Sequence, residues 1–254
     1  MGFLETMVKE IRRDVEAKAR KNPIEISRAV RGRSLLRAIE RAPHVPLVAE
    51  LKWASPSHGR IRESGDARVL ARDMVEGGAV GLSVLAEQRY FGGSPMTVRT
   101  VRSAVEVPVL YKSIIVHEYQ VYEAASVGAD AVLLMVSVLG DQTKRFVDLS
   151  RQLGMETLVE VGEEGEVEIG VSSCADMVGI NNRDMRTLRV DLNRTADLIN
   201  LIPEEHTVIS ESGISGPEDV RKVIEWGADA VLVGSAIMKS RDVKGKVRSL
   251  VMAR

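Results

Sequence analysis

Acidic, basic and amide side chains stand at the ends of otherwise apolar, β-branched runs of this sequence. In "VPLVAELKWASPSHG", residues 45–59, the apolar run closes with Glu50 and Lys52 before a Ser/Pro/Gly loop. Side chains two residues apart on a strand point to the same side, so this run presents a carboxylate and an ammonium group together. Burial and opposite charge displace pKa values in opposite directions, and such a pair could therefore supply an acid and a base.

The same pattern recurs at the ends of later runs, at Lys112, Glu160, Asn181 and Glu211. Three carboxylates and two ammonium groups in one cavity are costly to desolvate, and pairing recovers only part of that cost. A network of ion pairs that merely closes one end of the fold is the alternative interpretation, but leucines would close it at lower cost. We therefore expect these residues to form a catalytic acid–base site: Glu50, Lys52, Lys112, Glu160, Asn181 and Glu211.

A sequence pattern that recurs four times, called an echo below, predicts the architecture that brings these residues together. "GAVGLSVL" begins at Gly78, "GADAVLLM" at Gly128, "CADMVGIN" at Cys174 and "GADAVLVG" at Gly227, at nearly even intervals. Each echo ends a helical pattern and starts an apolar run, which is typical of a helix followed by a strand. Between the echoes lie further apolar runs, which bring the predicted strands to eight: 45–52, 107–112, 156–161 and 206–212.

Helical patterns fill the gaps between the runs. "GPEDVRKVIEWGAD" has Pro217 in its first turn and ends at Gly227, and "DARVLARDMVEGG" has Asp66 as N-cap and ends at Gly77. Apolar strands that alternate with helices indicate a parallel sheet covered by helices. Eight such units predict an α/β fold, a (β/α)8 TIM barrel. A doubly wound open sheet is disfavoured because no G-x-G-x-x-G follows the first strand.

The predicted barrel does not begin at the first residue. Residues 1–44 contain two helix candidates, 3–20 and 33–42, and no strand. We expect an N-terminal helical extension over 1–44 and a single barrel domain over 45–254.

Composition excludes several classes of function. The net charge of −1 over 254 residues gives no basic field for nucleic acid. Cys174 is the only cysteine and the four histidines lie far apart, so neither a disulfide nor a metal site is expected. No apolar run is long enough to span a membrane, and a secretory signal pattern is absent. We expect a cytoplasmic protein; the sequence leaves monomer and homodimer both open.

The loops after the last two predicted strands have residues that favour a phosphate-binding site. Loops after strands seven and eight of such barrels often bind phosphate, and "SESGIS" and "LVGSAIM" each end a strand in small residues before a helix start. Gly-Ser pairs are common in turns, but two of them at these two loops favour an anion site. The backbone N–H groups that could cradle a dianion belong to Ser212, Gly213, Gly234 and Ser235.

Two further side chains follow other predicted strands at the same end of the barrel, a basic one and an aromatic one. Arg183 follows strand six in "INNRDM", and its planar fork matches a carboxylate, although a loop arginine is more often solvated. Phe91, in "EQRYFGGS", offers a flat apolar wall or anchors its own loop.

Seven motifs give the chain a family resemblance. "AELKWASPSHG", "YFGGS", "LYKSI", "LVEV", "GINNRD", "SESGI" and "LVGSAIM" run in order from Ala49 to Met238. By these motifs the chain resembles the indole-3-glycerol-phosphate synthase family. The resemblance implies a barrel with extra N-terminal helices near the active-site face. It also implies a carboxy-lyase of tryptophan biosynthesis that converts 1-(2-carboxyphenylamino)-1-deoxyribulose 5-phosphate to indole-3-glycerol phosphate, CO2 and water without a cofactor.

The resemblance also implies a role for each candidate residue. Lys112 would protonate the ketose carbonyl during ring closure, and Glu160 would act as base in the dehydration with Lys52 or Lys112 as acid. Glu50 and Glu211 would orient the lysines, and Asn181 would hold a substrate hydroxyl. Arg183 and Ser55 would bind the anthranilate carboxylate beside Phe91. The phosphate would be held by Lys52, Ser212, Gly213, Gly234 and Ser235.

The sequence departs from the family pattern in two places. Ser113 and Ile114 follow Lys112, where the family usually has Asp-Phe, so an aspartate that could steady Lys112 is absent. His58 stands where a lysine is frequent, and Trp53 replaces a common basic residue.

Three alternatives remain on sequence grounds. Phosphoribosylanthranilate isomerase, a related phosphosugar barrel, would have a catalytic cysteine at the end of strand one, but Cys174 precedes strand six. A barrel that only binds phosphosugars is disfavoured by Lys112 and Glu160, while Ser113 keeps it open. An interaction protein would rely on the helix at 3–20.

Overall fold

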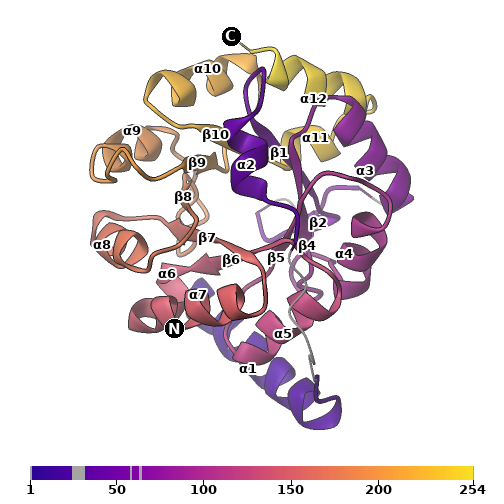
Figure 1. Cartoon of the computed structure of the whole chain (residues 1–254), viewed down its shortest axis with the longest axis vertical. Helices are drawn as coiled ribbons and strands as arrows, with labels where there is room; N and C mark the ends of the chain where they lie inside the picture. The colour runs from indigo at the N-terminus through magenta and orange to yellow at the C-terminus, as the bar shows by residue number, and fades with distance from the viewer. Residues whose placement is uncertain (1, 25–31, 58, 63–64, 254) are drawn as a thin grey trace.

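A closed barrel of parallel strands forms the centre of the molecule. The computed structural model describes residues 2–24, 32–57, 59–62 and 65–253, and within them eight parallel strands close on one another (Figure 1). Their order around the barrel is β1-β10-β9-β8-β7-β6-β5-β4. The predicted TIM barrel is therefore confirmed. The strands are β1 (Leu47–Leu51), β4 (Gly81–Leu85), β5 (Val109–Lys112), β6 (Ala131–Met135), β7 (Glu156–Val161), β8 (Met177–Asn181), β9 (Val208–Glu211) and β10 (Ala230–Val233).

A ring of helices surrounds the strands (Figure 1). The outer helices are α3 (Ala67–Glu76), α4 (Pro95–Arg102), α5 (Glu118–Ser126), α7 (Thr143–Gln152), α8 (Glu164–Ser172), α9 (Asn193–Ile199), α10 (Pro217–Glu225) and α12 (Val243–Val251). Shorter pieces follow β6 and β10, namely α6 (Val136–Leu139), the 3₁₀ turn η1 (Gly140–Gln142) and α11 (Ser235–Met238). After β1 the chain also forms a small antiparallel hairpin that the sequence did not predict, β2 (Ala54–Ser55) with β3 (Gly59–Arg60).

The apolar strands bury both of their faces. In β6, Leu133 and Met135 belong to the core inside the barrel, whereas Val132 and Leu134 belong to the core between the strands and the outer helices. Alternation along a strand sends successive side chains to these two cores. The continuous apolar runs of the sequence follow from this double burial.

Each strand that opens with the repeated sequence pattern is preceded by a helix whose last turn closes with a residue in the left-handed conformation. Gly78, Gly128 and Gly227 have φ of 106°, 81° and 109°, the region that a residue without a Cβ enters most easily. In the remaining echo Cys174 takes φ 61° at the same place. The repeat therefore preserves a backbone conformation even where the glycine is missing.

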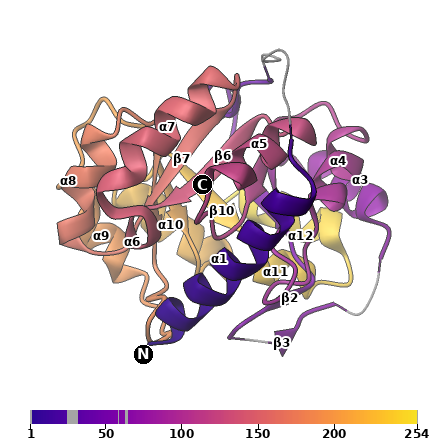
Figure 2. The ribbon, with the colours of Figure 1, turned by 90° about the horizontal axis from the view of Figure 1, so that it is seen from below.

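The N-terminal extension covers the barrel at two places. Helix α1 (Phe3–Lys21) runs along the side of the barrel from the mouth, where the strands end (Figure 2). Its Met7 and Ile11 join the inner core together with Ile114 and Met135. Helix α2 (Leu35–Glu40) lies instead over the base, where the strands begin (Figure 1). Only the first of the two helices thus lies near the mouth, among the described residues.

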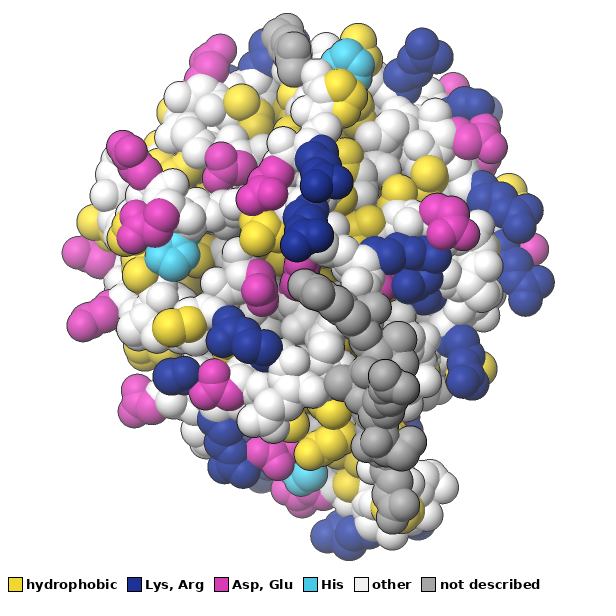
Figure 3. Space-filling model, in the orientation of Figure 1, with side chains coloured by type: hydrophobic (Ala, Val, Ile, Leu, Met, Phe, Trp, Pro, Cys, Tyr) yellow, Lys and Arg dark blue, Asp and Glu magenta, His cyan; other side chains and the backbone are white. Residues whose placement is uncertain are grey.

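Helix α2 is fixed to the base by a half-buried acid and a buried apolar side chain. Glu156, the first residue of β7, accepts hydrogen bonds from the backbone N–H groups of Leu35 (2.7 Å) and Leu36 (3.1 Å). A carboxylate at a helix N-terminus satisfies N–H groups that lack a partner in the helix. Leu35 is fully buried in the inner core. On the surface of this face, charged side chains of both signs are spread among apolar ones (Figure 3).

Helix α1 is held to the barrel by polar contacts with two other elements. Glu10 accepts a hydrogen bond from the Tyr90 hydroxyl (2.6 Å) in the loop after β4. Lys18 forms an ion pair with Glu123 of α5, and Glu123 also accepts a hydrogen bond from Tyr111 of β5 (3.0 Å). Because Tyr111 precedes Lys112, these contacts tie α1 to the strand that carries a candidate catalytic lysine.

We expect Leu35→Ala to lower the free energy of unfolding by about 2–5 kcal/mol, because it leaves a cavity in the inner core. The neighbouring Leu36 is only half-buried, so Leu36→Ala should cost about 1 kcal/mol. Urea unfolding followed by circular dichroism measures both. Equal losses in the two variants would show that α2 does not seal the base.

Candidate active site

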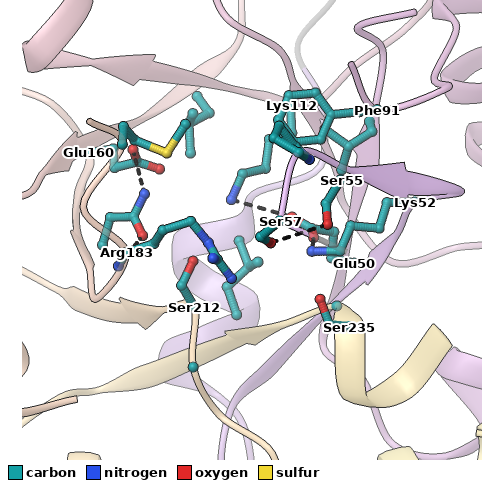
Figure 4. A pocket seen from close by; sticks show the side chains of 18 of the residues that line it. Glu50, Lys52, Ser55, Ser57, Phe91, Lys112, Glu160, Arg183, Ser212 and Ser235 are labelled. Atoms are coloured by element: carbon teal, nitrogen blue, oxygen red, sulfur yellow. Dashed lines mark hydrogen bonds and ion pairs between the residues drawn. The ribbon is translucent and has the colours of Figure 1, made fainter. Parts of the chain in front are cut away.

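One pocket at the mouth of the barrel collects nearly all of the predicted site residues (Figure 4). We call it the mouth pocket. Each residue comes from the end of a strand or the loop that follows it, as the barrel geometry requires. The predicted residues that line it are Glu50, Lys52, Ser55, Phe91, Lys112, Glu160, Asn181, Arg183, Ser212, Gly213, Gly234 and Ser235.

Lys112 lies between two buried carboxylates. Its Nζ is 2.6 Å from Glu211 Oε2 and 3.3 Å from Glu50 Oε2. The other oxygen of Glu50 is 2.6 Å from the Nζ of Lys52. The two charges at the end of β1 thus form part of a chain of ion pairs that joins β1, β5 and β9. Lys112 has these two partners although Ser113 replaces the family's usual aspartate.

The pKa values of the two carboxylates that contact Lys112, those of Glu50 and Glu211, are shifted in opposite directions. Burial alone would raise the pKa of Glu50, but Lys52 and Lys112 outweigh it and hold the pKa at about 2. Burial raises the pKa of Glu211 to about 7, because Lys112 offsets only part of the desolvation and the charge of Glu160 adds to it. Lys112 itself is desolvated, but the surrounding carboxylates raise its pKa, so it stays charged.

Glu160 faces the same pocket from β7. Its Oε1 accepts a hydrogen bond from Asn181 Nδ2 at 2.9 Å. Figure 4 shows Glu160 on one side of the pocket, across from Lys52 and Glu50. Burial raises the pKa of Glu160, while Lys112 and the hydrogen bond from Asn181 partly oppose the shift. A carboxylate of this kind takes up a proton more readily than a solvated one, which suits a general base.

Glu211 lies beneath the pocket and does not line it. The residue is 0% exposed and touches the pocket through Lys112. Its Oε1 has no hydrogen-bond partner among the described residues and lies against the backbone of Gly179. A Cβ on Gly179 would fall far inside van der Waals contact of that oxygen. Gly179, which the sequence analysis did not single out, therefore provides the room in which Glu211 lies.

Gly234 has a similar relation to Glu50. A Cβ at position 234 would collide with Glu50 Oε1, the oxygen that pairs with Lys52. This glycine was predicted for close approach of a phosphate. The structure shows that its missing side chain also leaves room for a carboxylate.

The loops after β9 and β10 present unpaired backbone donors. Ser212 and Gly213 have φ of 66° and 87°, so the chain leaves β9 through two consecutive left-handed residues. Within the described ranges, the N–H groups of Ser212, Gly213 and Gly234 donate to no acceptor. Unpaired N–H groups beside a pocket form an anion-binding site.

Arg183 places a second positively polarised group at the pocket. Its side chain extends into the pocket (Figure 4), and Nη1 donates to the Leu188 carbonyl at 2.9 Å. Among the described residues, no carboxylate lies within ion-pair distance of its guanidinium. Burial lowers the pKa of Arg183. A half-buried guanidinium without an ion-pair partner is stabilised strongly when an anionic ligand binds to it.

Ser55 and Phe91 lie on the wall formed by the loops after β1 and β4. Ser55 is buried and its Oγ is 3.4 Å from Ser57 Oγ. The Phe91 carbonyl accepts a hydrogen bond from the Ala54 N–H (3.1 Å), which joins the two loops. Phe91 thus both anchors its loop and lines the pocket. His58, the other departure from the family pattern in this loop, lies outside the described residues.

Sequence reasoning missed the apolar wall of the pocket. Leu133, Met135, Ile114 and Leu232 line it and belong to the inner core. Alternation along the apolar runs indicates that they face the inside of the barrel, but nothing in their residue types marks them as pocket residues. Within the part of the chain that the structure describes, no helix is long and apolar enough to cross a membrane.

Comparison with known proteins identifies the family. The family model described as indole-3-glycerol phosphate synthase matches residues 4–250. The chain belongs to the indole-3-glycerol phosphate synthase family. The match extends over α1 as well as the barrel.

Relatives of the family are similar over almost their whole length. The indole-3-glycerol phosphate synthase of Thermoanaerobacter sp. (strain X514) is 39% identical over 251 residues, which cover 98% of this chain and 96% of the relative. That of Methanopyrus kandleri is 45% identical over 227 residues, covering 87% and 88%. The resemblance that the motifs indicated is therefore confirmed.

Solved structures add evidence on the fold alone. A 3-hexulose-6-phosphate synthase from Salmonella typhimurium matches with a TM-score of 0.66 at 16% identity, covering 82% of this chain and 97% of that one. A thiamine phosphate pyrophosphorylase from Pyrococcus furiosus matches with a TM-score of 0.61 at 18% identity, covering 81% and 93%.

We expect Gly179→Ala to displace Glu211 from Lys112. Overpacking should lower the free energy of unfolding by about 1–3 kcal/mol. Misplacing a group beside the reacting centre should lower the enzymatic rate by about 10- to 100-fold. Thermal unfolding and steady-state kinetics measure the two effects. Gly165→Ala is the control, because open space surrounds that position in α8. It should leave the rate unchanged and should not lower the free energy of unfolding, since alanine favours a helix more than glycine does. A Gly179→Ala enzyme with the normal rate would contradict the positioning of Glu211.

Proposed function

We propose that this chain is an indole-3-glycerol phosphate synthase, which closes the indole ring of 1-(2-carboxyphenylamino)-1-deoxyribulose 5-phosphate with loss of CO2 and water. One observation carries the proposal. A charged lysine, Lys112, stands in a pocket that has two separate groups in need of an anion, the N–H groups near Gly213 and the guanidinium of Arg183. A substrate with a phosphate at one end and a carboxylate at the other matches both.

The phosphate end is assigned to the loops after β9 and β10. The unpaired N–H groups of Ser212, Gly213 and Gly234 would donate to phosphate oxygens, with Ser235 beside them. Lys52 would add a positive charge that Glu50 keeps in place at 2.6 Å.

The anthranilate end is assigned to Arg183, after β8, and to the wall formed by the loops after β1 and β4. Arg183 would pair with the carboxylate, with Ser55 as a second donor, and Phe91 would lie against the ring. Binding at both ends holds the ring carbon near the ketose carbonyl, which is the main requirement for closing a ring.

Ring closure requires an acid at the ketose oxygen. Lys112 suits this role because Glu50 and Glu211 keep it charged and fixed within a buried site. As the aromatic carbon attacks the carbonyl carbon, Lys112 would donate a proton to the oxygen. The bond to the carboxylate carbon then breaks, CO2 leaves, and its electrons restore the aromatic ring.

Dehydration requires a base and an acid. Glu160 would take the proton from the carbon beside nitrogen, while Asn181 orients its carboxylate and binds a substrate hydroxyl. The hydroxyl leaves as water with a proton from one of the two lysines that share Glu50, Lys52 or Lys112. Such an enzyme would act in the cytoplasm on a small phosphosugar, without nucleic acid as a partner.

Incubation of the protein with the carboxyphenylamino ketose phosphate should produce indole fluorescence and one CO2 per product. We expect Lys112→Ala to lower the turnover by at least ~10²–10⁴-fold, the usual cost of a lost general acid, with substrate affinity largely kept. Lys144→Ala, an exposed lysine on α7, should behave as the wild type. Near-normal turnover by Lys112→Ala would reject its role as acid, and an inactive wild-type protein would reject the proposed function.

We expect the turnover number to rise with pH through about 7. Below this pH Glu211, whose pKa burial raises to about 7, takes up a proton and its ion pair with Lys112 is lost. Above it, Glu211 is ionised and orients the lysine. Glu211→Gln has no charge at any pH, so it should be slower than the wild type above about pH 7, approach it at lower pH, and lose the component of the rise near pH 7. The turnover number is the quantity to follow, because it reports groups in the enzyme–substrate complex. An unchanged pH profile in Glu211→Gln would exclude Glu211 as the titrating group.

A further inference from the structure

A second cavity reaches the candidate base from the side. It has a volume of about 320 Å³ and lies at the N-terminal end of α1, beside the loops after β7 and β8. We call it the side cavity. Glu160 and Asn181 line both this cavity and the mouth pocket, so Glu160 stands in the wall between them. The residues that matter here are Leu4, Ser137, Glu160, Glu166, Asn181 and Arg194.

Glu166 faces the side cavity from α8. It is half-buried, and its Oε2 accepts a hydrogen bond from the Gly162 N–H at 2.6 Å. Within the described part of the chain, no cation forms an ion pair with it. Burial raises its pKa, and the charge of Glu166 in turn contributes to the raised pKa of Glu160. Two carboxylates that readily accept protons therefore face one cavity.

Most of the other charged groups around this cavity have a partner. Arg183, which also lines it, donates to the Leu188 carbonyl. Arg186 pairs with Glu163, and Arg194 lies 3.9 Å from Asp184. Glu5 of α1 also lines the cavity and accepts a hydrogen bond from the Gly2 N–H (2.9 Å). On the side of the mouth pocket, Glu160 faces Lys112 and Glu50. Glu166 is thus the carboxylate of this cavity that is best able to exchange a proton.

The proposed reaction takes up one proton from solvent in each turnover. The ketose oxygen gains a proton when the ring closes, and CO2 leaves without one. The hydroxyl gains a second proton when it leaves as water, and the carbon beside nitrogen gives up one to Glu160. Two protons are consumed and one is returned, so the lysines and Glu160 can be reset only with one further proton from outside. The substrate and product fill the mouth pocket during these steps.

We propose that the side cavity is the path by which this proton enters, with Glu166 relaying it through water to Glu160. Glu160 passes on this proton and the one that it took from the substrate to the donor lysines, which restores the acids and leaves Glu160 ionised. The inference rests on the proposed function. Glu166 is a positioning and relay residue that does not touch the substrate. It allows the acid and base groups to be reset while the phosphosugar still blocks the mouth.

Glu166→Gln tests the relay with little change of structure, because a side-chain amide oxygen can still accept the Gly162 N–H. We expect the turnover number to fall about fivefold to tenfold, less than the loss of a general base, since water still enters the cavity. KM should stay within about twofold, as Glu166 does not contact the substrate. The rate of a single turnover with enzyme in excess should be unchanged, because the first turnover uses protons already on the lysines. A small buffer such as imidazole should restore part of the lost turnover.

Glu168→Gln, an exposed glutamate on the same helix, is the matched control and should behave as the wild type. A second variant leaves Glu166 in place and narrows the cavity: Ser137→Leu should reproduce the loss of turnover, whereas Ser137→Ala should not. A wild-type turnover number in both Glu166→Gln and Ser137→Leu would overturn the relay. So would an equal loss in the single-turnover rate, which would indicate a purely structural role. Activity of the wild type with the substrate is measured first, so a failure of the proposed function is recognised separately.

Discussion

The placement of Lys112 between Glu50 and Glu211 is the interaction on which the rest of the site depends. It joins three strands that are not neighbours in the barrel, β1, β5 and β9, above a largely apolar inner core. Ion pairs in such a place are expensive to desolvate and seldom favourable for stability alone. Their value lies in holding a charged ammonium group at a fixed position, which the proposed ring closure requires.

Two glycines make this arrangement sterically feasible. Gly179 leaves room for Glu211, and Gly234 leaves room for Glu50, so each carboxylate lies where a side chain would otherwise be. The two acids nevertheless have opposite pKa shifts, because Glu50 contacts both lysines and Glu211 contacts only Lys112 among the described residues. One acid is therefore a permanent anion, while the other titrates near neutrality.

The fold and most of the site could be predicted from the sequence because both follow local rules. Apolar runs and left-handed helix ends repeat with the barrel, and the charges at strand ends meet because strand ends meet. Contacts between residues far apart in the sequence could not be predicted. No residue near Gly179 indicates that the Glu211 carboxylate packs against it. Likewise, no residue near Leu35 indicates that Glu156 accepts hydrogen bonds from the start of its helix. The small hairpin after β1 was missed because two-residue strands leave no periodic pattern.

The capping of α2 by Glu156 has a consequence for how the chain is synthesised. The two partners are 121 residues apart, so the acid leaves the ribosome long after the helix that it stabilises. Before then Leu35 can pack on strands that are already made, such as β4 at Gly81, but the N–H groups at the start of α2 lack this acceptor. A contact between residues so far apart closes a long loop, and the entropic cost of that closure must be met before the cap can form.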